Sequence, residues 1–315
     1  MKRVCKSALC LLLALCFLCS LAACTKAPAT PLERTAQYIL QTQPEAVASD
    51  WFALALARSN IKIPQKWLDA YLAAETQYVQ SKNGVLHDRK YTEYSRTILT
   101  LTALGQDVRN FAGYDLLKPL GDFEAANFQG LNGTIFALIA LDCGGYDVPE
   151  NPEAPVQATR EAYIQRILDA QTSDGGWALT GDAAEPDMTA MALQALAAHQ
   201  TQEAVAAAVT RGIDCLSAMQ GVDGAFTAWG STSCESVAQA ILAVTSLGLA
   251  PDDARFVKKG TTLEDALLRF ALEDGTFCHI SGGEADGMAT EQAFRALVAL
   301  QRAAAGENPL YRMTA

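Results

Sequence analysis

Polar residues stand at the starts of several apolar stretches of this chain, where their chemistry would be concentrated. Three of them are the acids Asp187, Glu235 and Glu291. Carboxylates that converge in a cavity of low dielectric constant have raised pKa values and can donate protons, and they can equally bind a cation, an amine or sugar hydroxyls. These acids are the candidate catalytic residues. The candidate ligand-binding residues are Asp50, Trp51, Glu93, Tyr94, Asn132, Asp187, Trp229, Glu235, Ser236, Glu291 and Gln292.

Helix capping is the structural alternative for each of these polar residues. Asp187 stands directly before Met188, and aspartate is among the preferred N-cap residues. An acid in the first turn also interacts favourably with the helix dipole. The argument for a site is therefore that such residues recur at equivalent places, since no single one is unusual.

The aromatic residues near these positions allow two interpretations. Trp51, Tyr94 and Trp229 can line an apolar or sugar-stacking pocket, and Trp229 is the best candidate because it begins a loop, Trp229-Gly230-Ser231-Thr232-Ser233. Trp177 and Phe226 are more simply core residues, since large aromatic side chains are mostly buried.

Other kinds of site find no support. His87, His199 and His279 are scattered, and no HExxH, GxSxG or glycine-rich phosphate loop is present. We therefore expect no metal ion and no cofactor. The net charge of −11 disfavours nucleic acid as a partner. The cysteines after the first 24 residues lack a CxxC pairing and are expected to be buried free thiols; they are Cys143, Cys215, Cys234 and Cys278.

The elements that would position these residues are two kinds of helix in alternation. One kind is amphipathic, as in 160–170, where Tyr163, Ile164, Ile167 and Leu168 form a stripe. The other kind is apolar nearly all round, which requires burial on every side. The apolar segments are 51–57, 98–104, 135–141, 188–198, 237–247 and 293–300. About six helical hairpins follow from this order, with the apolar helices inside.

A glutamine-and-glycine motif separates the two kinds of helix. Its clearest copy is Gln171-Thr172-Ser173-Asp174-Gly175-Gly176-Trp177, and a second begins at Gln220. The motif glycines 84, 121, 175, 224 and 275 are 37, 54, 49 and 51 residues apart, which indicates one repeated supersecondary unit. We expect the glycines to adopt left-handed conformations, the glutamine amides to bond backbone groups, and the aromatics to wedge between hairpins.

The Gln-x3-Gly-x-Trp pattern resembles the repeat of squalene cyclases. Arg211-Gly212, nine residues before Gln220, also fits that longer repeat. The chain thus resembles the terpenoid-cyclase and protein-prenyltransferase superfamily of α/α toroids, which includes the transcobalamins, and Asp187–Leu196 resembles inner-helix starts of those cobalamin carriers. The resemblance covers roughly residues 35–303 and implies an all-α, α6/α6 toroid with a central cavity.

The chain departs from the chemistry of each of these families. It has no Asp-x-Asp-Asp acid cluster, since Ala250 precedes Asp252-Asp253, and no Asp-x-Cys of the prenyltransferase zinc site. Cys234-Glu235 lacks the flanks of the complement thioester. No catalytic set is therefore carried over from the resemblance.

The first residues indicate export. Basic Lys2, Arg3 and Lys6 precede the apolar run 8–21, as in a secretory signal peptide. The run ends in Leu21-Ala22-Ala23-Cys24, which resembles the lipobox of bacterial lipoproteins and implies fatty acylation, as with palmitate, at Cys24. The expected organisation is a signal peptide over 1–23, a tether over 24–34, the toroid over 35–303 and a C-terminal tail over 304–315.

These observations predict a bacterial cell-surface lipoprotein, anchored to the outer face of the cytoplasmic membrane through Cys24. Its toroid is expected to be a non-catalytic binding module for a small molecule, glycan or peptide at the cavity mouth. Two alternatives stay open. One is a cyclase- or prenyltransferase-like enzyme with a rearranged acid site, and the other is a protein-interaction scaffold.

Overall fold

The computed structural model describes residues 29–228 and 230–314. The signal peptide, Cys24 and the candidate pocket residue Trp229 lie outside the described residues. The chain divides into two units, Met1–Thr30 and Pro31–Ala315, and the second is described here by itself.

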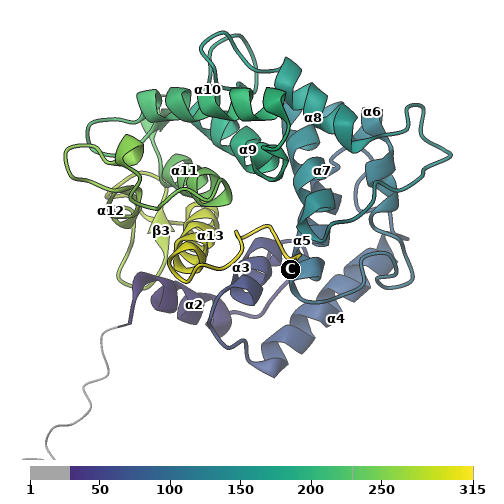
Figure 1. Ribbon diagram of the computed structural model, residues 1–315. Helices are drawn as coiled ribbons and strands as arrows, with labels where there is room; N and C mark the ends of the chain where they lie inside the picture. Colours follow the sequence, from purple (N-terminus) through teal and green to yellow (C-terminus); the bar gives the residue numbers. More distant parts are fainter. Residues whose placement is uncertain (1–28, 229, 315) are drawn as a thin grey trace, which may run out of the picture. The chain divides into compact units, whose positions relative to one another are not determined.

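Six helices of this unit pack in a closed series. Each contacts the next along the chain, and the last contacts the first (Figure 1). They are α3 (Asp50–Arg58), α5 (Thr92–Ala103), α7 (Leu131–Cys143), α9 (Pro186–Leu196), α11 (Cys234–Ser246) and α13 (Gly287–Ala304). They match the six segments that the sequence predicted to be apolar helices, although segments 98–104, 188–198 and 237–247 run one or two residues past the helix ends. Those segments are largely buried.

The outer elements are less regular than the inner ones. They are α2 (Pro31–Gln41), α4 (Gln65–Ser81), α6 (Phe123–Ala126), α8 (Arg160–Asp169), α10 (Glu203–Met219) and α12 (Leu263–Leu268), with short 3-10 helices η1 (Lys118–Gly121), η2 (Asn127–Gln129), η3 (Ala197–His199) and η4 (Ala254–Phe256). Before α7 the outer layer is only η1, α6 and η2. No helix in the described part of the chain is long and apolar enough to cross a membrane.

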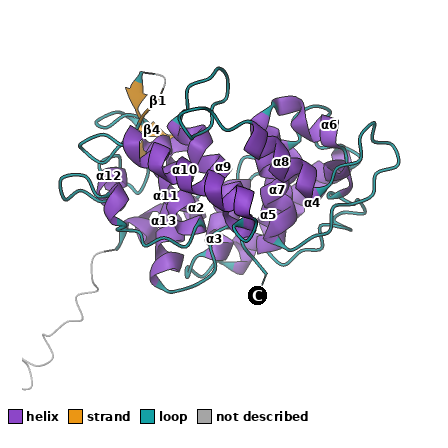
Figure 2. Ribbon diagram, turned by 45° about the horizontal axis from the view of Figure 1, so that its top comes forward, coloured by secondary structure: helices purple, strands orange, loops and turns teal. Residues whose placement is uncertain are grey.

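Among the described residues, strands occur only in two small antiparallel hairpins on loops (Figure 2). One pairs β1 (Thr227–Ala228) with β2 (Ser231–Thr232), and the other pairs β3 (Phe277–Cys278) with β4 (Ala285–Asp286). The mainly helical fold expected from the sequence is thus observed.

The glycine motif joins neighbouring outer and inner helices. Gly175 has φ of 94° and lies 3.1 Å, measured from an ideal Cβ, from the carbonyl oxygen of Arg211, so a side chain there would be both strained and crowded. The Gln171 amide donates to the carbonyls of Gly175 and Ala208, at 2.7 and 2.8 Å. Trp177 is fully buried. The motif therefore connects adjacent hairpins, and its role is structural.

The chain after α13 returns across the series of inner helices (Figure 1). Residues 307–314 lie against the C-terminal ends of α3, α7 and α13, where Met313 N donates to the Cys143 carbonyl at 2.7 Å. Leu310 and Tyr311 are buried there. The predicted tail is thus an ordered part of the fold, which we call the 307–314 segment.

The four cysteines are free thiols in the structure. Cys143, Cys234 and Cys278 are buried, and Cys215 is half-buried. Burial raises the pKa of the Cys143 thiol to about 12, which keeps it protonated and unreactive at neutral pH.

Candidate functional site

A cavity of about 480 Å³ opens where the six inner helices begin. Because every inner helix contributes to it, the closed series itself shapes the cavity. It is lined by Val47, Ala48, Trp51, Thr92, Arg96, Asn132, Phe136, Met191, Gln239, Met288, Glu291, Gln292 and Arg295. Apolar and aromatic walls thus alternate with a few polar groups, which is typical of small-molecule sites.

Arg295 of α13 is the most connected polar residue of the cavity. Its guanidinium Cζ lies 4.2 Å from the ring centroid of Trp51, and Nη2 donates to Glu291 Oε1 at 3.1 Å. Nη1 donates to the Tyr311 hydroxyl at 2.8 Å. The Nε donor is buried and has no partner. The Nε donor is therefore closed off from the cavity, in a guanidinium whose side chain is only 4 % exposed.

Glu291 supplies the carboxylate of the cavity wall. Burial raises its pKa, while the neighbouring charges of Arg295 and Arg96 oppose that shift. The cavity thus contains an acid with a raised pKa beside a fixed cation.

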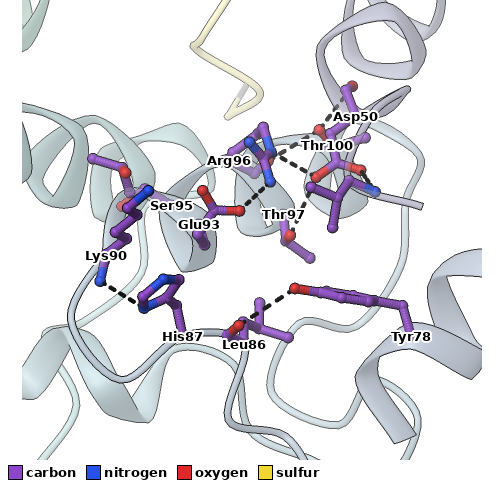
Figure 3. Close-up of polar contacts among 12 residues, drawn as sticks. Asp50, Tyr78, Leu86, His87, Lys90, Glu93, Ser95, Arg96, Thr97 and Thr100 are labelled. Atoms are coloured by element: carbon purple, nitrogen blue, oxygen red, sulfur yellow. Dashed lines mark hydrogen bonds and ion pairs between the residues drawn. The ribbon is translucent and has the colours of Figure 1, made fainter. Parts of the chain in front are cut away.

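Arg96 of α5 also lines the cavity and is held by two carboxylates (Figure 3). Its Nε donates to Asp50 Oδ2 at 2.9 Å, and Nη2 donates to Glu93. Burial alone would lower the Arg96 pKa, but the charges of Asp50 and Glu93 outweigh it and raise the pKa. The charge of Arg96 is consequently neutralised within the protein.

A second acid lies behind Asp50 in the wall between α3 and α4. Val47 N donates to Asp50 Oδ1 at 3.1 Å and to Glu75 Oε2 at 3.3 Å, while the Tyr71 hydroxyl donates to Asp50 Oδ1 at 2.8 Å. Burial, followed by the charge of Asp50, raises the Glu75 pKa to about 8. Val47 itself has φ of 65°, which is strained for a β-branched residue. Buried carboxyls therefore hold the strained loop at the cavity edge.

Amide side chains cross the interior in a chain of hydrogen bonds. Gln194 Nε2 donates to Gln239 Oε1 at 2.9 Å, and Gln239 Nε2 donates to Gln292 Oε1 at 2.7 Å. Within residues 29–228 and 230–314, the Asn132 side chain and Gln292 Nε2 make no hydrogen bond to protein. These amide groups are therefore available to a ligand.

The structure brings together four of the predicted site residues, Trp51, Asn132, Glu291 and Gln292, as direct lining of the cavity. Asp50 and Glu93 lie behind them and act on the cavity through Arg96. Tyr94 is buried instead, where its hydroxyl accepts a hydrogen bond from Leu86 N at 3.0 Å.

The predicted residues of α9 and α11 lie outside the cavity lining. Glu235 Oε2 is 2.8 Å from His279 Nδ1. Burial raises the Asp187 pKa, and a hydrogen bond from Ser236 opposes that shift. The expected N-cap role of Asp187 is wrong, because α9 begins at Pro186 and its N-cap is Glu185.

Five of the lining residues that were not among the predicted site residues share a positional rule. Arg96, Phe136, Met191, Gln239 and Arg295 each follow a predicted residue by three or four positions on the same inner helix. Residues at that spacing lie on one helix face. The signal was therefore present, one turn further into each helix.

A smaller cavity of about 300 Å³ lies at the other ends of α7, α9 and α11, beside the 307–314 segment. Asp142 in its wall contacts His199 at 2.6 Å and Arg160 at 3.2 Å. Tyr311 belongs to this cavity and also contacts Trp51 and Arg295 of the larger one. It therefore separates the two spaces.

Zinc is the metal that the prenyltransferase resemblance brings into question. In the part of the chain that the structure describes, no three His, Cys, Asp or Glu side chains converge to hold a metal ion. The side chains present therefore do not fit a prenyltransferase-type zinc site.

No protein-family model matches this chain, and no curated protein matches it in sequence. Solved structures do match. A protein from Actinoplanes, 16% identical, aligns with a TM-score of 0.56 over 87% of this chain and 98% of that chain. Candida albicans protein geranylgeranyltransferase-I, complexed with GGPP, is 13% identical and aligns with a TM-score of 0.60 over 90% of this chain and 95% of that chain. At these identities the likeness shows the fold alone, and that fold is the helical toroid of the protein prenyltransferases.

Proposed function

We propose that this protein is an α6/α6 toroid that binds an uncharged polar ligand, a glycan in the first instance, in the cavity at the starts of its inner helices. The observation that carries the proposal is the combination of internally neutralised charges and free amides. Arg96 is paired with Asp50 and Glu93, and Arg295 is paired with Glu291.

The charge arrangement disfavours anions as ligands. A carboxylate or phosphate is best bound by two parallel donors of one guanidinium, but each guanidinium of the cavity already faces a carboxylate of the protein. Glu291 lies against Arg295, and Asp50 and Glu93 lie against Arg96. Asn132 and Gln292 add amide groups, and Trp51 and Phe136 add aromatic surface. Hydroxyl groups on an apolar ring face are the chemistry that this set complements.

The test is binding of matched probes to the purified domain from residue 29 onward. We would titrate chitotriose, cellotriose and N-acetyl-trialanine amide as neutral probes, compare glucose with glucuronate as the matched neutral and anionic pair, and follow tryptophan fluorescence and calorimetry. We expect a neutral probe to bind, and Asn132→Leu to weaken that binding by roughly tenfold, as loss of one hydrogen-bonding group does.

Gln200→Leu is the matched control, because Gln200 is an exposed amide outside the cavity. The proposal would be contradicted if glucuronate bound as tightly as the neutral probes. It would also be contradicted if Asn132→Leu left the affinity for the neutral probe unchanged. Failure of all the neutral probes would also count against it.

A second candidate function is an enzyme with a rearranged acid site. Glu291 favours it, because this candidate acid lines the cavity and has a raised pKa. Turnover of a bound glycan that is abolished by Glu291→Gln, with binding retained, would establish this function. Binding without turnover would support the non-catalytic module.

We further propose that the domain is held at the outer face of a bacterial cytoplasmic membrane through a lipidated Cys24. The support is the charged, then apolar, then Leu-Ala-Ala-Cys order of the first residues. Cys24→Ser should abolish incorporation of labelled palmitate, whereas the control Cys19→Ser should leave it intact. Equal labelling of both variants would overturn the assignment.

A further inference from the structure

The 307–314 segment is recognised mainly through its backbone. Arg58, which ends α3, donates from Nε to the Leu310 carbonyl at 3.0 Å and from Nη2 to the carbonyls of Pro309 and Arg312, at 3.1 and 2.8 Å. Arg302 of α13 donates from Nε to the Asn308 carbonyl at 2.7 Å. Two guanidinium groups thus bind a run of main-chain carbonyls around a turn, in which Arg312 N donates to the Pro309 carbonyl at 3.0 Å. Such contacts recognise a peptide independently of most of its side chains.

The ends of α3 and α13 form the walls of the groove that holds the segment. They are joined by hydrogen bonds in which the segment takes no part. Arg302 Nη1 donates to the Arg58 carbonyl at 2.7 Å. Asn60 and Gln301 exchange two hydrogen bonds, at 3.0 and 2.7 Å. These contacts hold the end of α3 against α13, so the groove does not depend on the segment that fills it.

One side chain of the segment enters a deep socket. Tyr311 is 8 % exposed, its hydroxyl accepts a hydrogen bond from Arg295 Nη1 at 2.8 Å, and its ring centroid is 6.3 Å from that of Trp51. Leu310 is buried beside it. A buried aromatic anchor among backbone contacts is the usual organisation of a peptide site.

The two arginines are partly removed from water where they contact the segment. Burial lowers the pKa of Arg58 to about 10 and also lowers that of Arg302. The main-chain carbonyls of the segment supply acceptors for these partly buried donors.

We infer that the ends of α3, α7 and α13 form a peptide-binding site, which the 307–314 segment occupies in cis and from which it exchanges with a peptide that presents a tyrosine in a turn. This site is distinct from the ligand cavity and does not depend on the function proposed for it. Because Tyr311 also binds Arg295, occupancy of the peptide site fixes one wall of that cavity.

The test separates the segment from the folded full-length chain. A protease site is inserted between Gly306 and Glu307, which are both exposed, and is cut after purification. We expect native mass spectrometry to show the cleaved segment still bound. A fluorescein-labelled peptide of residues 307–315 should then exchange into the site, seen as a saturable rise in anisotropy.

Competitor peptides test the anchor. The peptide carrying Tyr311→Ala should compete at least about thirtyfold more weakly than the native peptide, as expected for a hot-spot residue, and Tyr311→Phe should fall between them. Equal competition by the Tyr311→Ala peptide, or failure of the labelled peptide to enter a cleaved protein that keeps its helical circular dichroism, would overturn the inference.

A measurement on the uncut chain covers the case in which cleavage unfolds the protein. The Met313 amide, bonded to the Cys143 carbonyl, should exchange its hydrogen through local opening well before the amides of α11 do. Protection of Met313 equal to that of α11 would show that the segment opens only on global unfolding, and the inference would fall.

Discussion

The guanidinium of Arg295 lies over the indole of Trp51, with Cζ 4.2 Å from the ring centroid. The same guanidinium bonds Glu291 on its own helix and Tyr311 on the 307–314 segment. Arg295 is thus the point where α13, α3 and that segment meet inside the lumen. Replacing Arg295 should therefore lower the stability of the protein as well as weaken ligand binding.

Arg295→Leu should destabilise the protein by about 3–5 kcal/mol, because breaking a buried pair leaves its partner charge uncompensated. The double variant Arg295→Leu with Glu291→Leu should recover much of this loss, since no buried charge then remains unpaired. Urea unfolding of both single variants and of the double variant measures the coupling.

Lys118→Ala is the control for this cycle, because its pair with Glu153 spans 3.4 Å and both side chains are exposed. It should change stability by less than about 1 kcal/mol. Strictly additive losses at Arg295 and Glu291 would show that the two side chains are not coupled.

The ring of buried helices could be predicted because its signal is local. Segments such as 135–141 and 237–247 have no polar face, and only complete burial accommodates them. The site was predicted one turn too early: Glu291 and Asn132 were identified, but Arg295 and Phe136 were not. The role of Tyr311 depends on its contact with Trp51, a residue that is far away in the sequence. No local sequence pattern predicts such a contact.

The glycine at 212 should not tolerate even a methyl group. An ideal Cβ there would lie 2.6 Å from Trp177 Cζ3 and 2.9 Å from Leu193 Cδ2. Trp177 cannot move aside easily, because it is fully buried and donates to the Ile167 carbonyl at 2.7 Å. Overpacking lowers the free energy of unfolding by about 1–3 kcal/mol. This loss equals or exceeds the gain of about 1 kcal/mol that alanine, with its higher helix propensity, brings over glycine.

Gly212→Ala should therefore lower the melting temperature. Gly287→Ala, at the start of α13 with no atom near its added Cβ, is the matched control and should be neutral or slightly stabilising. If the two variants melt alike, the wedge between Trp177 and Gly212 is not a rigid contact.

The motif glutamine Gln220 should be important for stability although it is remote from the cavity. Its Nε2 donates to the carbonyls of Gly224 and Phe256, at 2.9 and 3.0 Å. Gln220→Leu leaves both carbonyls without that donor, which should cost roughly 2 kcal/mol in denaturant unfolding. Gln202→Leu removes an exposed amide that makes no cap hydrogen bond and should have little effect. Equal stability of the two variants would remove the structural role assigned to the motif glutamine.

The buried carboxyl of Glu75 should make the stability of the protein fall as the pH rises. Its pKa is about 8 in the folded protein against an ordinary value of 4.5, so between these values the folded state binds a proton that the unfolded state has released. The stability that this bound proton contributes is therefore fully present below about pH 4.5 and is lost as the pH rises through 8.

Glu75→Gln mimics the protonated form and should remove this fall, so that the free energy of unfolding of the variant exceeds that of the native protein by a few kcal/mol at pH 9. Urea midpoints at pH 5, 7 and 9 measure the difference, with exposed Asp69→Asn on the same helix as control. Parallel pH profiles for Glu75→Gln and the native protein would contradict the assignment, because they would show that Glu75 holds no extra proton in the folded state.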